Sequence, residues 1–339
     1  MRYINIGNRK VGAGQRVFII AEIGVNHNGS LKLAKGMVDG AKACGADAAK
    51  FQTFKTEDLL ARDIRHKSQF EMLKQLELSE GGFRTLSDYC RKKKIIFLST
   101  PFDYRSACFL YRLGVPAFKI GSGELTNTPL LLQVAGYRRP IILSTGMATL
   151  REVREAVRTV YSTNNKDLIL LHCTSNYPAK YSDVNLRAMD TLRERFGAPV
   201  GYSDHTEGIE ASIAAVTMGA CVIEKHFTLD KGFRGPDHKA SLEPDEFRDL
   251  VRAIRNTEEA MGDGVKTPRD SEQEVKKLAR KSIVAACDIS KGGRLNLDML
   301  AVKRPGTGLA PKYLKKLVNK KAMVDIKKDQ VLTRDEVCL

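Results

Sequence analysis

Eight short apolar runs recur between residues 18 and 228, and segments with amphipathic helical periodicity separate them. Each run begins apolar and ends polar: FIIAEIG from Phe18, AAKFQTF from Ala48, IIFLSTP from Ile95, AFKIGS from Ala117, PIILSTG from Pro140, LILLHCT from Leu168, PVGYSDH from Pro199 and VIEKHFT from Val222. The repeated strand and helix pattern indicates parallel strands joined by right-handed crossovers. Eight such units predict an α/β fold, a (β/α)8 TIM barrel, whose polar strand ends form a chemically active rim.

A doubly wound open sheet is the alternative interpretation of this pattern. Such a sheet usually has fewer strands and carries a glycine fingerprint for phosphate, which this sequence lacks. An amphipathic helix predicted from Glu243 to Met261 closes the barrel, and Gly262-Asp263-Gly264 ends that helix. We therefore expect the barrel to occupy residues 1–262.

The hydrophobic pattern changes after the barrel. Residues 263–280 form a charged stretch that predicts a linker, whereas residues 281–339 contain short strand-like runs and turns. That segment is too short for a second barrel, so we predict a small β-rich domain. A long polar insertion between Lys55 and Leu78 follows the second strand, and we expect it to cover part of the barrel mouth.

The composition fits one barrel and a small second domain. The chain has 339 residues, and a hydrophobic fraction of 42% suffices to fill such a core. The sequence shows no apolar leader and no stretch of roughly 20 apolar residues, so we expect a cytoplasmic protein with no membrane partner. The seven cysteines include no C-x-x-C pair, which favours reduced thiols.

The formal net charge of +16 suits an anionic substrate or a polyanionic partner. Basic runs such as Arg91-Lys92-Lys93-Lys94 contain no interleaved aromatic residues or glycines, so we interpret them as solvated helix faces. Nucleic acid binding by the basic C-terminal domain is the non-catalytic alternative. The polar rim argues against it, and we expect no nucleic acid partner.

Two histidines end neighbouring predicted strands. The seventh predicted strand ends in His205 and the eighth in His226, so both can reach one ion at the rim. An imidazole pair leaves several coordination positions for water and substrate oxygen, which suits Mn²⁺, Co²⁺ or Mg²⁺ better than a closed zinc site. The alternative is a pair of structural histidines that are satisfied by hydrogen bonds.

Two lysines and several hydroxyl groups share the same predicted rim. Ammonium groups with converging hydroxyl donors neutralise and orient a phosphate, so this set predicts an oxyanion site. The alternative is that each lysine pairs with a rim glutamate. The residues are Lys50 and Lys119, with Thr100, Ser122, Ser144, Ser175 and Ser203.

Three carboxylates accompany this positive cluster. Glu22, Glu124 and Glu224 lie at strand ends, and at least one of them could move a proton or orient water. Ion pairing with the lysines is the alternative role, above all for Glu224. Cys173 has no evident histidine partner, and we interpret it as a core residue rather than a nucleophile.

The motifs at these positions resemble those of the sialic acid synthase family. That family condenses phosphoenolpyruvate with an N-acetylated hexosamine aldehyde to give a nine-carbon ulosonic acid, and its C-terminal antifreeze-like (SAF) domain resembles residues 281–339. The motifs are AEIGVNHNG at Ala21, GADAAKFQTF at Gly45, FKIGSGE at Phe118, STGMAT at Ser144, HCTSNYP at His172, GYSDHT at Gly201, EKHFTLDKGFRGPDHKASLEP at Glu224 and RPGTG at Arg304.

The resemblance implies roles for individual residues. It makes His205 and His226 ligands of a divalent metal, most simply Mn²⁺, and it places the lysines and hydroxyl groups named above around phosphoenolpyruvate. Ser175 departs from family members that carry asparagine there. The residues implied to contact the open-chain sugar are Gln52, Glu124, Tyr177 and Asp237, and Glu22 is implied to lie near the reacting carbons.

The resemblance also implies a domain-swapped homodimer in which Arg304 approaches the sugar of the neighbouring subunit. A rigid Arg304-Pro305-Gly306 turn presents a guanidinium suited to an acetamido oxygen or a hydroxyl. The implied substrate is N-acetylmannosamine, which would make the chain an N-acetylneuraminate synthase. The PDHKAS segment also fits a legionaminic acid synthase, and less well a pseudaminic acid synthase. A Schiff-base aldolase that uses Lys50 or Lys119 is the more distant alternative.

Overall fold

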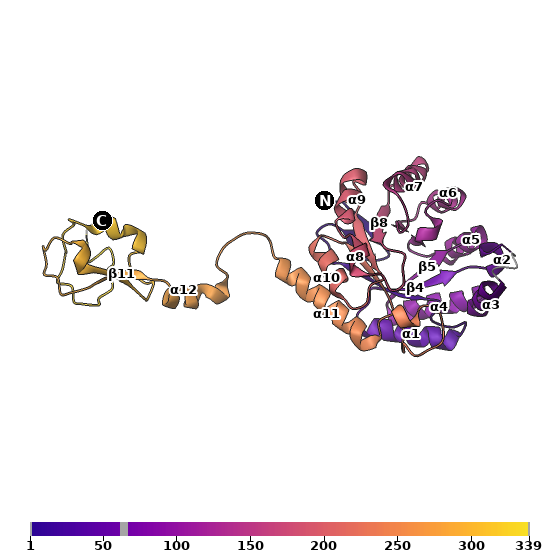
Figure 1. Ribbon diagram of the computed structural model, residues 1–339, viewed down its shortest axis with the longest axis horizontal. Coiled ribbons are helices and arrows are strands. Elements are labelled where there is room, and N and C mark those ends of the chain that lie inside the picture. Colours follow the sequence, from indigo (N-terminus) through magenta and orange to yellow (C-terminus); the bar gives the residue numbers. More distant parts are fainter. Residues whose placement is uncertain (1, 62–66, 338–339) are drawn as a thin grey trace. The chain divides into compact units, whose positions relative to one another are not determined.

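A computed structural model describes residues 2–61 and 67–337. The chain divides into two compact units, Met1–Gly262 and Asp263–Leu339. Figure 1 draws the first unit in indigo to orange and the second mainly in yellow. Within the described ranges, no helix combines the length and the apolar composition needed to cross a bilayer. Residues 62–66, part of the insertion expected at the barrel mouth, lie outside the described residues.

The first unit contains the eight predicted parallel strands, which confirms the barrel. They are β3 (Phe18–Gly24), β4 (Ala48–Thr53), β5 (Ile96–Pro101), β6 (Phe118–Ile120), β7 (Ile141–Ser144), β8 (Leu168–Cys173), β9 (Val200–Asp204) and β10 (Val222–His226). The sheet order is β5-β4-β3-β10-β9-β8-β7-β6, and the end strands β5 and β6 lie beside one another. The sheet therefore closes on itself, as a TIM barrel requires.

Helices surround this sheet and alternate with its strands (Figure 1). They are α1 (Leu31–Ala43), α2 (Thr56–Leu59), α3 (Lys67–Leu76), α4 (Glu80–Lys93), α5 (Tyr104–Leu113), α6 (Thr128–Gly136), α7 (Leu150–Ser162), α8 (Tyr181–Val184), α9 (Ala188–Phe196), α10 (Glu210–Thr217) and α11 (Pro244–Met261). Helix α11 begins with a capping box between Glu243 and Glu246 and ends at Gly262, close to its predicted bounds.

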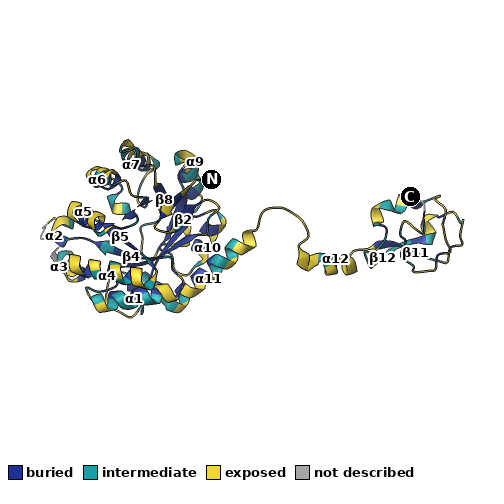
Figure 2. Cartoon of the chain, turned by 180° about the vertical axis from the view of Figure 1, so that it is seen from behind, coloured by how far each residue is buried: buried dark blue, intermediate teal, exposed yellow. Residues whose placement is uncertain are grey.

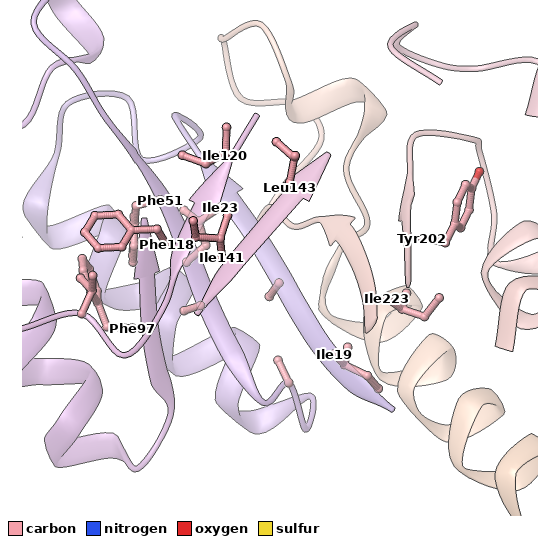
Figure 3. Packing of buried hydrophobic residues seen from close by; sticks show 14 of the residues in the cluster. Ile19, Ile23, Phe51, Phe97, Phe118, Ile120, Ile141, Leu143, Tyr202 and Ile223 are labelled. Carbon is pink, nitrogen blue, oxygen red and sulfur yellow. The ribbon is translucent and has the colours of Figure 1, made fainter. Parts of the chain in front are cut away.

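Successive strand residues point alternately to the helices and to the barrel interior. Ile19, Ile23, Phe51 and Tyr202 belong to the large core cluster between sheet and helices, part of which Figure 3 shows. Figure 2 shows the matching contrast between buried strands and exposed outer helix faces. The inward-facing residues form the second cluster, which includes Phe18, Ile20, Ala48, Leu98, Ile142 and Leu171.

The N-terminal hairpin was not predicted from the sequence. Strands β1 (Tyr3–Ile6) and β2 (Arg9–Gly12) pair antiparallel, and Gly7 between them has a φ of +58°. Glycine at the first position of such a two-residue turn is the expected signal. Ile4, Ile6 and Val11 join the interior cluster, so the hairpin covers the end of the barrel where the strands begin.

The second unit has its own small core, which includes Ile283, Leu295, Leu317 and Leu332. It contains α12 (Gln273–Ala279), strands β11 (Ser282–Ala285) and β12 (Leu300–Lys303), which pair antiparallel, and α13 (Leu314–Leu317). Residues 263–280, predicted as a linker, include helix α12 and group with this unit.

Candidate active site

A cavity of about 500 Å³ opens where the barrel strands end. The alternation of side chains along each strand explains why polar groups line this cavity. A strand that points an apolar residue into the barrel near its start points a polar residue into the cavity two or four positions later. Most of the predicted site residues line this cavity: Glu22, Lys50, Gln52, Thr100, Lys119, Ser122, Ser144, Ser175, Tyr177, Ser203, His205, His226 and Asp237.

The base of the cavity holds both predicted lysines. Lys119 Nζ donates to Ser144 Oγ at 2.7 Å, and Lys50 Nζ donates to Thr100 Oγ1 at 3.3 Å. Both lysine side chains are at most 4% exposed. Two buried ammonium groups with hydroxyl neighbours form a site suited to a phosphate or carboxylate group.

Both lysines also contact carboxylates, so the ion pairing considered from the sequence is present. Lys50 Nζ lies 2.7 Å from Glu22 Oε2 and 3.6 Å from Glu224 Oε2, and Lys119 Nζ lies 3.6 Å from Glu224 Oε1. Ser203 Oγ donates to Glu224 Oε1 at 2.8 Å. The two interpretations of the lysines are compatible, because a buried ammonium group can pair with a carboxylate and still have further N–H donors for an anion.

The two buried carboxylates have different pKa values. Burial raises the pKa of Glu22, and the nearby Glu224 charge adds to the rise despite the opposing charge of Lys50. Burial would also raise the pKa of Glu224, but Lys119 and Lys50 together lower it to about 2. Glu224 is therefore the permanent counter-charge of the lysines, whereas Glu22 is the group better suited to exchange a proton.

His205 and His226 lie side by side above this charged base, with ring centroids 5.6 Å apart. His205 Nδ1 is 2.7 Å from the carbonyl of Thr174, which can only accept, so Nδ1 carries the hydrogen and Nε2 the lone pair, with Ser203 Oγ at 3.5 Å from Nε2. Burial lowers the pKa of His205 to about 4, which keeps the imidazole neutral. Both features are those of a histidine that can bind a metal ion.

His226 supports the same interpretation. Its Nδ1 is buried and has no hydrogen-bond partner among the described residues, and Asp237 Oδ2 is 4.0 Å away. Across residues 2–61 and 67–337, no group of three or more His, Cys, Asp and Glu side chains is arranged to hold a metal. An ion bound by the two imidazoles would therefore take its remaining ligands from water or substrate.

Three of the four predicted sugar contacts, Gln52, Tyr177 and Asp237, line the same cavity as these histidines. The ring of Tyr177 lies 4.1 Å from that of His205, and Gln52 Nε2 is 3.4 Å from Glu22 Oε1. Asp237 follows β10 and lines the cavity close to His226. Amide, phenol and carboxylate groups at one mouth can bind the hydroxyl groups of an open-chain sugar.

Two predicted site residues, Glu124 and Arg304, are not part of the described lining of this cavity. The carboxylate of Glu124 accepts a hydrogen bond from Asn127 Nδ2 at 2.6 Å. Arg304 is exposed on the second unit. The roles that the sequence resemblance implied for these two residues stay predictions.

The cavity also has features that the sequence analysis missed. Cys173, which we predicted to be a core residue, is buried but lines the cavity, and its Sγ lies 3.1 Å from Ser122 Oγ. The mouth has an apolar wall, defined here as Val25, Phe54, Leu59, Met72, Leu73 and Phe102. The only sequence signal for this wall was the phenylalanine directly after two strands, in FQTF and STPF.

Buried polar contacts join the loop after β3 to the loop that carries Asp237. Asn26 Nδ2 donates to Ser241 Oγ at 2.9 Å, and Ser241 Oγ donates to the backbone carbonyl of Asp237 at 2.7 Å. His27 accepts a hydrogen bond from the backbone of Gly29 at 3.1 Å, and burial lowers the pKa of His27 to about 4. The first strand therefore helps to place the last loop of the barrel.

The fold is a TIM barrel whose cavity contains two buried lysines and a pair of histidines. The family model described as the NeuB family matches residues 37–266, and the SAF domain model matches residues 280–337. The chain therefore belongs to the NeuB family and is an enzyme of that family with a C-terminal SAF domain.

Relatives of known name extend over nearly the whole chain. An N,N'-diacetyllegionaminic acid synthase of Legionella pneumophila is 48% identical, covering 94% of this chain and 96% of its own length. The N-acetylneuraminate-9-phosphate synthase of Homo sapiens is 39% identical, covering 97% and 95%. The crystal structure of an N-acetylneuraminic acid synthetase from Leptospira borgpetersenii superposes with a TM-score of 0.76 at 39% identity, covering 81% of this chain and 95% of that one.

The buried His27 predicts a specific loss of stability in acid. Its pKa is near its ordinary value of 6.5 in the unfolded chain and about 4 in the folded one, so the unfolded state binds the extra proton between these values. Stability should therefore fall as pH decreases from 6.5 towards 4, by about 1.4 kcal/mol per pH unit for this residue. Replacing His27 with Gln should remove this part of the pH dependence.

The measurement is urea unfolding, followed by circular dichroism, of wild type and His27→Gln at about pH 7.5 and about pH 5. Circular dichroism suits a chain without tryptophan. The wild type should lose more stability than the variant between the two pH values. Equal losses would show that His27 does not stay neutral when the chain folds.

Proposed function

We propose that the chain condenses phosphoenolpyruvate with an open-chain N-acetylated aldose and water, giving a nine-carbon 2-keto sugar acid and phosphate. The observation that carries this proposal is the order of the polar groups from the base of the cavity to its mouth, in a barrel of the NeuB family. Two buried lysines with hydroxyl groups form the base, and two histidines and sugar-binding groups lie above them. An anionic three-carbon substrate below and a polyhydroxylated aldehyde above fit this order.

The lysine base would bind and orient phosphoenolpyruvate. Lys119 with Ser144, and Lys50 with Thr100, supply the charge-assisted donors for its phosphate and carboxylate oxygens. Glu224 contacts both ammonium groups through its two oxygens, and its charge favours the protonated form of each lysine. Fixing both ends of the small substrate restricts which face of its double bond meets the sugar.

A divalent ion held by His205 and His226 would supply Lewis-acid polarisation of the sugar aldehyde. Gln52, Tyr177 and Asp237 hold the sugar chain so that its carbonyl carbon faces C3 of phosphoenolpyruvate. The new bond joins C3 to the aldehyde carbon, and the aldehyde oxygen takes up a proton to become a hydroxyl. The electron pair of the double bond is used in this step, which leaves C2 electron-poor.

Water then adds to C2, and the tetrahedral intermediate expels phosphate by cleavage of the C2–O bond. Glu22 would accept the proton of that water, because it lies beside Lys50 at the base and burial raises its pKa, which makes its carboxylate a stronger base than an exposed one. The products are phosphate and a 2-keto acid. No oxidant or reductant is consumed.

Two sugars compete as the natural substrate. N-acetylmannosamine would give N-acetylneuraminate, the product first expected from the sequence. The higher identity to an enzyme named for N,N'-diacetyllegionaminic acid supports a diacetamido-trideoxyhexose instead. The apolar wall of the mouth supports the same choice, since a methyl group is favoured against apolar side chains where a hydroxyl would lose its hydrogen bonds to water.

Phosphate release from phosphoenolpyruvate tests the proposed function. We expect release only when an N-acetylated aldose is present, with a higher kcat/KM for 2,4-diacetamido-2,4,6-trideoxymannose than for N-acetylmannosamine. Chelation should abolish the release and Mn²⁺ should restore it, because two imidazoles hold an ion loosely. Release without any sugar, or a stable lysine adduct after borohydride treatment, would contradict the proposal, and the adduct would favour a Schiff-base aldolase.

The apolar wall predicts how sugar selectivity can be changed. Leu73→Asn places an amide at the wall, so it should help the 6-hydroxyl sugar and disfavour the 6-deoxy sugar. We expect the ratio of the two kcat/KM values to fall by about 10-fold. The control is Leu132→Asn on the outer face of α6, where the leucine is 44% exposed and the ratio should not change. A ratio unchanged in a folded Leu73→Asn variant would exclude contact between the wall and the sugar.

We also propose that the enzyme is a domain-swapped homodimer in which Arg304 of one subunit completes the site of the other. Arg304→Ala and His226→Ala should each reduce activity to near background. Unfolding and refolding the two variants together should restore about a quarter of the wild-type activity, because half of randomly paired dimers are mixed and each mixed dimer has one intact site. Mixed dimers that stay as inactive as their parents would rule out the exchange.

A further inference from the structure

A buried ion pair lies directly behind the two histidines and has no part in the chemistry above. Lys225 Nζ is 3.0 Å from Asp204 Oδ2, and both side chains are 0% exposed. Lys225 lies between Glu224 and His226 on β10, and Asp204 lies between Ser203 and His205 at the end of β9. The described lining of the catalytic cavity includes neither Lys225 nor Asp204.

The alternation of strand residues places this pair on the helix side of the barrel. Tyr202 and Ile223 belong to the core cluster between sheet and helices, and Figure 3 shows both among those side chains. Asp204 and Lys225 follow them by two positions and therefore face the same way. The next residues, His205 and His226, line the cavity on the opposite side.

The pair holds the backbone on both sides of His205. Asp204 Oδ1 accepts hydrogen bonds from the backbone N and the Oγ1 of Thr206, at 2.9 and 2.7 Å. Lys225 Nζ donates to the backbone carbonyl of Thr206 at 2.6 Å. Ser212 of α10 donates to Asp204 Oδ2 at 2.6 Å. The residue before His205 and the residue after it are thus bound to one buried cluster.

The same pair fixes the register of the two strands. In the β9–β10 ladder Lys225 lies opposite Asp204, and Glu224 lies opposite Ser203. A slip of one residue would separate the charges inside the core, where an unpaired ion is costly. The paired positions directly before His205 and His226 therefore determine how far apart the two imidazoles lie.

A contribution to stability alone does not account for this pair. Removing two charges from water costs about as much as their attraction returns, so apolar residues of similar volume stabilise a core equally well or better. A buried pair is better explained where it specifies one arrangement of the strands. Here that arrangement is the relative position of the two imidazoles.

We propose that Asp204 and Lys225 are positioning residues that hold His205 and His226 at the spacing required to bind one divalent metal ion. The inference rests on the metal site within the proposed function. It does not depend on which sugar is used or on turnover.

The test is Mn²⁺ affinity without substrate, measured by titration with electron paramagnetic resonance detection of free Mn²⁺. Lys225→Met keeps most of the length of the side chain and removes its charge, and we expect a Kd at least about 10-fold weaker than that of the wild type. Lys225→Arg retains the charge and should recover most of the affinity. Asp204→Asn, which preserves shape, gives a second variant if Lys225→Met does not fold.

The matched control is Arg255→Met. Arg255 Nη2 pairs with Asp47 Oδ2 at 3.2 Å, with side chains 14% and 10% exposed, near the opposite ends of the strands. Both Met variants should lower the Tm, but Arg255→Met should leave the Kd for Mn²⁺ unchanged. Equal losses of affinity in the two variants, or wild-type affinity in folded Lys225→Met and Asp204→Asn, would show that the pair is only structural.

A wild type that binds no Mn²⁺ would overturn the positioning proposal together with the metal assignment. Absence of phosphate release in an enzyme that does bind Mn²⁺ would instead contradict the proposed reaction. The binding and turnover measurements therefore separate the two failures.

Discussion

Four almost completely buried charged side chains lie together at the base of the cavity, and the active site depends on how they neutralise one another. Burying any one of these charges alone would cost free energy, because it would lose its contacts with water. This holds for Lys50 and Lys119 and equally for Glu22 and Glu224. Glu224 contacts both lysines and stays ionised, while the raised pKa of Glu22 lets the group of four adjust its charge by one proton. The free site is thus held together by the same ammonium groups that an incoming anion would need.

The layering of the barrel follows from this constraint. Apolar residues such as Phe18 and Ile20 fill the lower interior, and the N-terminal hairpin covers it from below. Inside the barrel, the charged residues Glu22, Lys50, Lys119 and Glu224 lie in the upper layers, where they line the cavity. Outside the sheet, the helix layer buries Asp204 and Lys225 behind the histidine pair. The polar groups of the cavity therefore pack on the apolar interior cluster, and the Asp204–Lys225 ion pair lies on the helix side of the strands that carry the histidines.

Much of this arrangement could be predicted from the sequence, because strand alternation converts a polar strand end into a position at the cavity. Lys119, His205 and His226 were found in this way. Features that depend on contacts distant in the sequence could not be found. Nothing local distinguishes Glu124, which bonds to Asn127, from a carboxylate in the cavity. The apolar wall could not be predicted either, because its residues come from the three segments that follow β3, β4 and β5. The spacing of its members on helices is the same as that of residues that pack in a core.

The first and last barrel strands in the sequence pair with one another, and this pairing has a consequence for folding. Strand β10 pairs directly with β3, and His226 lies opposite Glu22 in that ladder. The contact spans most of the barrel sequence, so it belongs to the slow, long-range part of folding. An incomplete barrel, whether newly synthesised or truncated before β10, would carry the lysines but lack the neighbour that completes the site. We therefore expect activity only after β10 has paired with β3, so that incomplete chains are inactive.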